Sequence, residues 1–203
     1  MKIRSIALLL TMLGCLNGCT NAPAAGTPEA AKPKIGSSGP AWKELLGTDD
    51  AKHSLADLKA SEVVVVCFTC NHCPVAKAYE DRLIAFDKDY RDKAVTLVAI
   101  NVNNLEEDKL PAMKKRAEEK KFAFDYLYDP TQQIGRDYNA KVTPHTFVLD
   151  KDRKIAYMGA IDDSQNEKKV KERYLRNAVD ALLAGKTPDK AVTRQIGCSI
   201  KYE

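Results

Sequence analysis

The sequence has no long hydrophobic run and no strong excess of charge of either sign. Its apolar stretch near the N-terminus covers residues 6–13, which is shorter than the roughly 18 residues that cross a bilayer as a helix. The 32 basic and 28 acidic residues give a formal charge of +4, and about +2 remains without Lys2 and Arg4. Neither a nucleic-acid footprint nor a polybasic membrane patch is therefore expected.

Internal repeats are also absent, and tryptophan and histidine are scarce, with one and three copies among 203 residues. The absence of repeats argues against a solenoid or another repeat architecture. Hydrophobic residues nevertheless make up 44% of the chain, which is enough apolar material for one ordinary globular core. The length and composition together predict a single folded domain with additional segments.

The first residues have the features of an export signal. Lys2 and Arg4 supply a positive start, and residues 6–13 supply a short apolar core. Such a segment is removed during export, so we expect residues 1–18 to be absent from the mature chain. Export would also bring the cysteines into a compartment where disulfides persist.

A lipid attachment site follows this segment. Residues 16–19, Leu-Asn-Gly-Cys, resemble the lipobox of bacterial lipoproteins, with a weaker competing site at Cys15. The resemblance implies lipidation of Cys19, membrane contact through the lipid only, and an extracytoplasmic location, which is the periplasmic face in a Gram-negative host. Residues 19–40 are rich in proline and small residues, which predicts a flexible tether to a domain at 41–203.

The first half of this domain alternates strand and helix signals. Two β-branched runs, at residues 63–68 and 95–100, suit strands buried on both faces. Apolar residues at helical spacing follow each run, beginning after Pro74 and at Pro111. The order strand, helix, strand, helix implies parallel strands joined by right-handed crossovers, and therefore an α/β fold.

The second half follows a different pattern. A short helix is expected around Ile134 and Tyr138. Apolar runs at residues 146–149 and 154–158, separated by a short polar turn, predict a β-hairpin. An apolar stripe then predicts a last helix, which ends before Gly185.

The strongest chemical signal is a pair of cysteines, Cys70 and Cys73, at the junction of the first predicted strand and helix. A helix N-terminus favours a thiolate over a thiol. Cys70, at the turn, is the predicted nucleophile, and Cys73, one turn further on, would resolve a mixed disulfide by forming a redox-active Cys70–Cys73 disulfide. His72, when protonated, would stabilise the Cys70 thiolate and make the pair more oxidising.

The same residues allow two other interpretations. Cys67 extends the run, and together with Cys70, Cys73 and either His72 or His145 it offers four metal ligands. Cys67 falls within the predicted strand, however, and is expected to point into the core as a small apolar residue. A structural disulfide is the other possibility in an exported chain. We predict redox chemistry by thiolate exchange, which needs no metal and no organic cofactor.

A second motif, Val142-Thr143-Pro144-His145, immediately precedes the strand predicted at residues 146–149. Together with the earlier cysteine pair, it resembles the thioredoxin superfamily. The resemblance implies a thioredoxin-like fold, with a central mixed β-sheet flanked by helices. It also implies a cis peptide bond before Pro144, facing the cysteines, and contact between Thr143 and a bound partner.

Four segments narrow this resemblance to the bacterial redoxins grouped with the alkyl hydroperoxide reductase/thiol-specific antioxidant superfamily. They are residues 70–82, 143–145, 160–163 and 197–201. The resemblance implies an extracytoplasmic thiol–disulfide oxidoreductase whose partners are protein thiols or disulfides or a small-molecule oxidant. The active site differs from that of thioredoxin itself, because Thr69 and the pair Asn71-His72 replace the tryptophan and the Gly-Pro of that protein.

Two alternative functions stay open. The first is an antioxidant thiol peroxidase, although such enzymes place a threonine or serine three residues before the reactive cysteine. Here Cys67 and Cys70 hold those positions, and Thr69 is out of register. The second is a copper-binding protein or metallochaperone, because related folds deliver copper outside the cytoplasm.

Three further features have no single interpretation from the sequence. Cys198 is a possible accessory redox thiol, a possible disulfide partner of Cys67, or inert. His145 either approaches Cys70 or caps the following strand. The acidic residues 106–108 are expected to form a solvated turn rather than a metal site.

Overall fold

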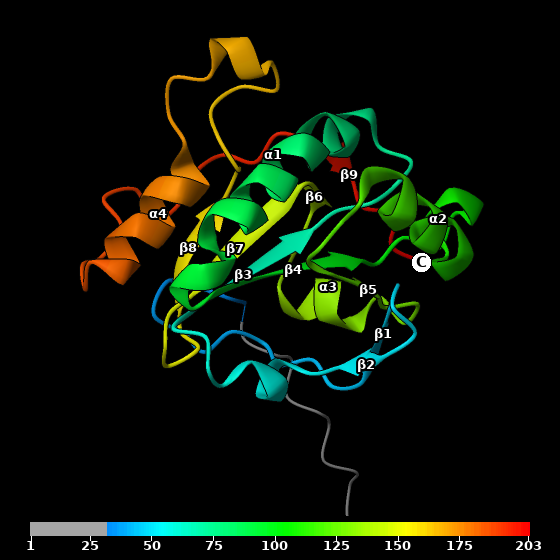
Figure 1. Ribbon diagram of the computed structural model, residues 1–203, viewed down its shortest axis with the longest axis horizontal. Coiled ribbons are helices and arrows are strands. Elements are labelled where there is room, and N and C mark those ends of the chain that lie inside the picture. The colour runs from blue at the N-terminus through cyan, green and yellow to red at the C-terminus, as the bar shows by residue number, and fades with distance from the viewer. Residues whose placement is uncertain (1–31) are drawn as a thin grey trace, which may run out of the picture.

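A computed structural model describes residues 32–203 of the chain. The predicted export signal, the lipidation of Cys19 or Cys15, and the tether up to residue 31 lie outside the described residues. The described chain folds into a central mixed β-sheet with helices on both faces (Figure 1). This arrangement confirms the predicted α/β, thioredoxin-like fold class.

The central sheet has seven strands in the order β2-β1-β5-β4-β3-β7-β8. Its strands are β1 (Leu45–Gly47), β2 (Lys52–His53), β3 (Val63–Phe68), β4 (Val95–Asn101), β5 (Asp125–Tyr128), β7 (His145–Leu149) and β8 (Ile155–Gly159). β3 pairs in parallel with β4 and antiparallel with β7, and β7 and β8 form the predicted hairpin. The parallel pairing within the first half and the antiparallel second half are both as predicted.

Four α-helices flank the sheet: α1 (Pro74–Tyr90), α2 (Leu110–Lys120), α3 (Gln133–Asp137) and α4 (Tyr174–Leu183). Short 3₁₀ turns lie at Leu55–Leu58, before α1, and at Arg91–Lys93, Glu106–Asp108 and Glu167–Lys169, between the helices. Both α1 and α2 have a proline in their first turn, where the missing N–H costs no helical hydrogen bond. None of the helices in residues 32–203 is long and apolar enough to span a bilayer.

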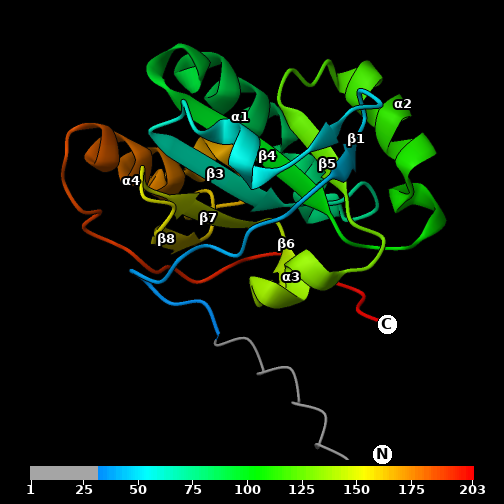
Figure 2. The same cartoon turned by 90° about the horizontal axis from the view of Figure 1, so that it is seen from below.

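The core is divided between the two faces of the sheet. Alternate residues of β3 point to opposite sides, with Cys67 facing the cluster under α1, α2 and α4 and Phe68 facing the cluster under α3. Figure 2 shows α1 and α4 on one side of the sheet and α3 on the other. The β-branched composition of β3 follows from this burial on both faces, and Cys67 lies in the core as predicted.

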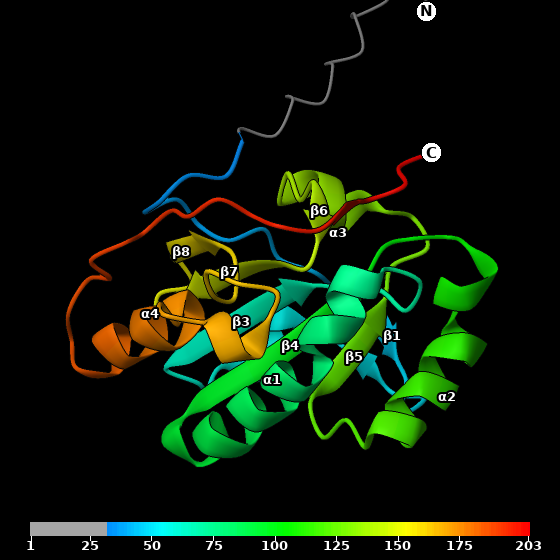
Figure 3. The same ribbon diagram turned by 90° about the horizontal axis from the view of Figure 1, so that it is seen from above.

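A second, two-stranded sheet was not expected from the sequence. In it, β6 (Val142–Thr143) pairs antiparallel with β9 (Cys198–Ser199), with Thr143 opposite Cys198. Figure 3 shows the C-terminal tail running from α4 past β6 and α3 to the end of the chain. The tail is therefore part of the fold, and it brings Cys198 to the loop that contains Pro144.

The folded domain also begins earlier than the predicted boundary at residue 41. Gly36 N–H donates to the carbonyl of Ile155 at 2.8 Å, and Gly39 N–H donates to the carbonyl of Arg153 at 2.8 Å. Ser38 forms a β-bridge with Lys154. The last residues of the expected tether thus pair with the edge of the sheet at β8, because that edge offers unpaired backbone groups.

Candidate functional site

The predicted cysteine pair lies in the turn between β3 and α1, but the residue at the start of the helix is Cys73. Its sulfur accepts a hydrogen bond from the backbone N–H of Ala76 at 3.4 Å, as an N-cap does. Cys70 precedes the helix by a further three residues and is 2% exposed. Cys73, rather than Cys70, therefore occupies the N-cap position on which the helix N-terminus acts most directly.

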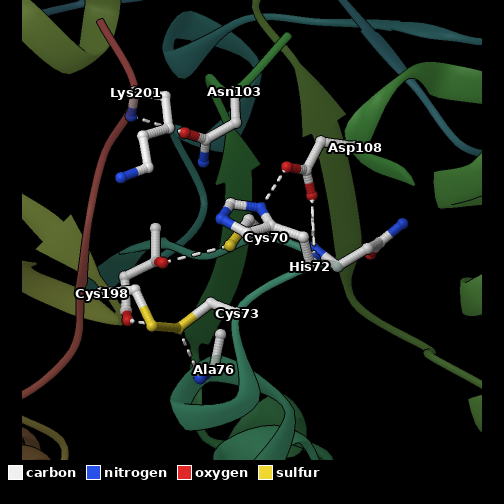
Figure 4. The surroundings of a disulfide bond; sticks show 10 residues. Cys70, His72, Cys73, Ala76, Asn103, Asp108, Cys198 and Lys201 are labelled. Carbon is white, nitrogen blue, oxygen red and sulfur yellow. Dashed lines mark hydrogen bonds and ion pairs between the residues drawn. A yellow bond between two sulfur atoms is a disulfide. The ribbon is translucent and has the colours of Figure 1, made fainter. Parts of the chain in front are cut away.

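The disulfide in this structure joins Cys73 to Cys198, with 6.1 Å between the Cα atoms (Figure 4). Cys70 is a thiol, so the predicted Cys70–Cys73 pairing is not the one present. The reason is the pairing of β6 with β9, which places Cys198 opposite Thr143. The possible pairing of Cys198 with Cys67 is wrong, because Cys67 lies inside the core as a thiol.

The loop before β7 faces both cysteines of the turn. The peptide bond between Thr143 and Pro144 is cis, as predicted. The Thr143 hydroxyl lies 3.1 Å from the Cys70 sulfur, within hydrogen-bond distance. The Thr143 carbonyl oxygen lies 3.4 Å from the Cys73 sulfur. Thr143 is thus in contact with both sulfurs, through its side chain and its backbone.

A buried carboxylate, Asp108, holds the turn from the other side. Its Oδ1 accepts hydrogen bonds from the backbone N–H groups of Asn71 at 2.7 Å and His72 at 3.1 Å. Its Oδ2 is in contact with Nδ1 of the His72 ring, and Figure 4 shows that ring beside the Cys70 sulfur. Asp108 is 0% exposed, so the expectation of a solvated acidic turn is wrong for this residue.

The sequence signal for Asp108 was its position at the end of an acidic run. Only Asp108 of the three acidic residues is buried, because the 3₁₀ turn directs it toward the backbone of residues 71 and 72. Its own backbone carbonyl accepts a hydrogen bond from the Asn101 side chain at 2.9 Å, which ties the turn to β4.

Three side chains of the site could hold a metal ion. They are Cys70, His72 and Asp108, whose donor atoms lie within 4.8 Å of one another. The ligand set expected from the sequence is not brought together, because Cys67 faces the core and Cys73 is bonded to Cys198. The Asp108 carboxylate already accepts hydrogen bonds from the turn, so the arrangement has a complete role without a metal.

Burial dominates the electrostatics of the thiols. The pKa of Cys70 is raised to about 11, chiefly by burial; the hydrogen bond from Thr143 opposes this rise, and the charge of Asp108 adds to it. Burial also raises the pKa of Cys67 to about 12. Both thiols are therefore protonated at neutral pH in this disulfide state, and Cys70 needs a proton acceptor to react as a thiolate.

This electrostatic arrangement predicts opposite effects of two nearly isosteric substitutions. Thr143→Val removes the hydroxyl that stabilises the Cys70 thiolate, so the pKa of Cys70 should rise. Asp108→Asn removes a negative charge that opposes the thiolate, so the pKa should fall. The measurement is the rate of Cys70 alkylation between pH 7 and 11, which follows the thiolate fraction and should change by about tenfold per pH unit below the pKa.

Thr143→Ser is the matched control, because it keeps the hydroxyl and should leave the alkylation profile close to that of the unmodified protein. Peptide mapping restricts the readout to Cys70. Profiles of Thr143→Val and Asp108→Asn that shift in the same direction would contradict this account of the pKa.

His145 is the first residue of β7 and contacts Phe147 and the C-terminal tail. Its ring packs against Phe147, with 4.4 Å between ring centroids, and its Nε2 lies 3.0 Å from the Gln195 amide nitrogen. Burial lowers the pKa of His145 to about 4, so the ring is neutral at pH 7. Its partner Gln195 lies on the C-terminal tail, which connects His145 to the placement of Cys198.

Two residues of the segments that suggested the family have a structural role. Arg82 of α1 and Asp162 of the loop after β8 form a buried ion pair, with 2.5 Å between Nη1 and Oδ2. The Tyr79 hydroxyl donates to the other oxygen of Asp162 at 3.2 Å. This pair fastens the helix that begins at Cys73 to the hairpin end of the sheet.

Comparisons with known proteins agree with this architecture. An uncharacterized conserved protein from Geobacillus kaustophilus is 36% identical over 88% of this chain and 98% of its own, with a TM-score of 0.79. A hypothetical protein from Sinorhizobium meliloti is 31% identical over 85% and 97% of the two chains, also with a TM-score of 0.79.

A putative thiol:disulfide interchange protein DsbE from Chlorobium tepidum shares the fold at 23% identity and a TM-score of 0.56, over 63% of this chain and 85% of its own. A comparison with curated proteins gave no match. The model of the AhpC/TSA family matches residues 35–158, which is more than half of the chain. The chain belongs to the AhpC/TSA family of thioredoxin-like redoxins.

Proposed function

We propose that this chain is an extracytoplasmic thiol–disulfide oxidoreductase in which Cys70 is the attacking thiol. The observation that carries the proposal is the arrangement around Thr143, which contacts the Cys70 thiol through its hydroxyl and the Cys73 sulfur through its carbonyl oxygen. A nucleophilic thiol and a second redox sulfur are thus held by one residue, next to the cis bond of Pro144.

In the reduced protein, the Cys70 thiolate attacks one sulfur of a partner disulfide and releases the other partner sulfur as a thiolate. The Cys73 thiolate then attacks Cys70 in the mixed disulfide, which releases the reduced partner and leaves a Cys70–Cys73 disulfide. Two electrons pass from the protein dithiol to the partner. The reverse sequence oxidises a partner dithiol, and neither direction needs an organic cofactor.

His72 is suited to accept the Cys70 proton. Asp108 contacts Nδ1 of the ring, which orients the imidazole and leaves Nε2 for the proton of the neighbouring thiol. Cys70, His72 and Asp108 would thus act as nucleophile, base and orienting carboxylate, the three roles found in catalytic triads. Such activation is needed because burial raises the pKa of Cys70 far above neutral pH.

The proposed location and anchoring depend on the N-terminal sequence. Cleavage before Cys19 and lipidation of that residue would hold the domain at a membrane surface outside the cytoplasm. The Cys73–Cys198 disulfide is compatible with that compartment, since disulfides of this kind persist in oxidising environments.

A trapping experiment tests the assignment of Cys70. The double variant Cys73→Ser, Cys198→Ser removes the neighbouring sulfurs that could resolve a mixed disulfide. On incubation with a cystine-containing peptide, it should accumulate a mixed disulfide with the peptide at Cys70, because the attack can occur and the release cannot. Mass spectrometry of the proteolytic fragments identifies the modified residue.

Adding Cys70→Ser to this double variant is the control, and it should abolish the adduct although Cys67 remains. Adduct formation at Cys67 would contradict the assignment. Rapid consumption of hydrogen peroxide by Cys70, with no reaction with the cystine peptide, would instead support the thiol peroxidase alternative.

A further inference from the structure

The C-terminal tail is built into the site. Beyond the β6–β9 pairing, Ile200 N–H donates to the carbonyl of Lys141 at 2.9 Å. Lys201 N–H donates to the Asn103 side chain at 2.8 Å, and the Tyr202 hydroxyl donates to the carbonyl of Ala140 at 2.8 Å. These contacts hold the tail on the C-terminal side of Cys198, so that the sulfur is presented to the turn by a docked segment.

The approach of the tail depends on a glycine. A Cβ atom at position 197 would lie 2.2 Å from the carbonyl oxygen of Thr143 and 2.6 Å from its carbonyl carbon. Real Cβ contacts are never so short, and the obstructing atoms belong to backbone beside a cis proline bond. Gly197 therefore permits the close contact between tail and loop that brings Cys198 within reach of Cys73.

Three sulfurs meet in one small apolar cluster. Cys70 and Cys73 are buried there with Ala76, and Cys198 and Val75 pack against them at the edge. Cys73 is bonded to Cys198, and Cys70 is a thiol on the same side of the Thr143 loop. A thiol beside a disulfide is what thiol–disulfide exchange within one molecule requires.

We propose that Cys198 is a third redox residue, and that the protein exchanges its disulfide internally between Cys73–Cys198 and Cys70–Cys73. This inference rests on the proposed function, because it uses the same attacking thiol. The Cys70 thiolate attacks the Cys73 sulfur, the Cys73–Cys198 bond breaks, and Cys198 leaves as a thiolate. One thiol and one disulfide are present before and after, so no external oxidant or reductant is consumed, and the proton of Cys70 passes to Cys198 through His72 and solvent.

The exchange links the reactive pair to the position of the tail. With Cys198 released, strand β9 loses its covalent link to the turn and is held by its two residues paired with β6 and by noncovalent contacts of the tail on either side. The edge of β6 can then take up another extended segment with a cysteine opposite Thr143, by strand addition. The tail thus occupies the site while Cys73 is bonded to Cys198. It leaves the site once the Cys70–Cys73 disulfide forms.

An alkylation experiment on the oxidised full-length chain, without any substrate, tests the exchange. Incubation with iodoacetamide traps any Cys198 thiol that the exchange releases. We expect a growing fraction of molecules with alkylated Cys198 and a Cys70–Cys73 disulfide, as identified by peptide mapping. A Cys73–Cys198 disulfide that persists while Cys70 alone is alkylated would overturn the inference.

Two variants make the experiment specific. Cys70→Ser should abolish the alkylation of Cys198, because the attacking thiol is missing and the disulfide stays in place. Gly197→Ala should increase the rate of Cys198 alkylation, since the added Cβ collides with the Thr143 carbonyl. Ser199→Ala is the matched control in the same strand and should leave the rate unchanged. Equal rates in Gly197→Ala and Ser199→Ala would count against release of the tail.

The outcomes separate this inference from the proposed function. If Cys70 forms the mixed disulfide with the cystine peptide but Cys198 is never alkylated in the oxidised chain, the internal exchange is wrong and the oxidoreductase assignment stands. If Cys198 is alkylated in a Cys70-dependent manner but no mixed disulfide with the peptide forms, the internal exchange stands and the oxidoreductase assignment is wrong.

Discussion

Replacing Cys70 by serine is expected to reduce the rate of dithiol–disulfide exchange with a peptide substrate to background, a loss on the order of 10³-fold or more. A serine hydroxyl at this position keeps the hydrogen bond with Thr143, but it does not form a disulfide and is a far weaker nucleophile than a thiolate. The measurement is the turnover of a cystine-containing peptide with a small thiol as reductant.

Cys67→Ala is the matched control, because it removes the other free thiol of the described residues, which lies in β3 three residues before Cys70. Cys67 lies in the core, and burial raises its pKa to about 12, so its removal should leave turnover within about a factor of two, as is usual away from the reacting atoms. If the two variants lost activity to the same extent, Cys70 would not be the nucleophile.

Replacing Asp162 by asparagine is expected to lower the free energy of unfolding by about 3–5 kcal/mol, because it leaves a buried cation without its counter-charge. The side chains of Arg82 and Asp162 are 7% and 3% exposed. The carbonyl of Ser164, at 2.8 Å from Arg82 Nη1, still accepts a hydrogen bond in the variant but carries no full charge. Urea denaturation followed by circular dichroism provides the measurement.

A partly exposed ion pair between α1 and α4 supplies the comparison. Asp89 of α1 and Arg176 of α4 lie 2.8 Å apart, with side chains 50% and 25% exposed. Asp89→Asn should cost no more than about 1 kcal/mol, because solvent screens the pair. If Asp162→Asn and Asp89→Asn lowered the free energy of unfolding by similar amounts, burial would not be the reason that the Arg82–Asp162 pair stabilises the fold.

The long, strongly patterned elements of the fold could be predicted from the sequence. The β-branched runs of β3 and β4 and the apolar stripes of α1 and α4 repeat over enough residues to show the period of a strand or a helix. Strand β5, with the sequence Asp-Tyr-Leu-Tyr, was missed because four residues give too little periodicity. β6 and β9 have two residues each, and they exist only because the tail docks on the loop before β7.

The short motifs of the site could be predicted from the sequence, but the contacts between residues far apart in the sequence could not. The spacing of Cys70 and Cys73 and the proline at 144 are visible in the sequence, and both lie where the fold resemblance implied. The partner of Cys73 lies 125 residues away, and no local pattern relates the two. Asp108 looked like a solvated acid because its burial depends on the backbone N–H groups of Asn71 and His72, which only the folded turn directs toward it.

The separation of the two bonded cysteines has a consequence for heat resistance. The bond from Cys73 to Cys198 closes a covalent loop that contains four strands of the central sheet and all four α-helices of the described residues. Loops of roughly 100 residues reduce the entropy of the unfolded chain by an amount worth about 4–5 kcal/mol, whereas a bond from Cys70 to Cys73 closes a loop of almost no length. The melting temperature of the domain should therefore be higher when Cys73 is bonded to Cys198 than when it is bonded to Cys70.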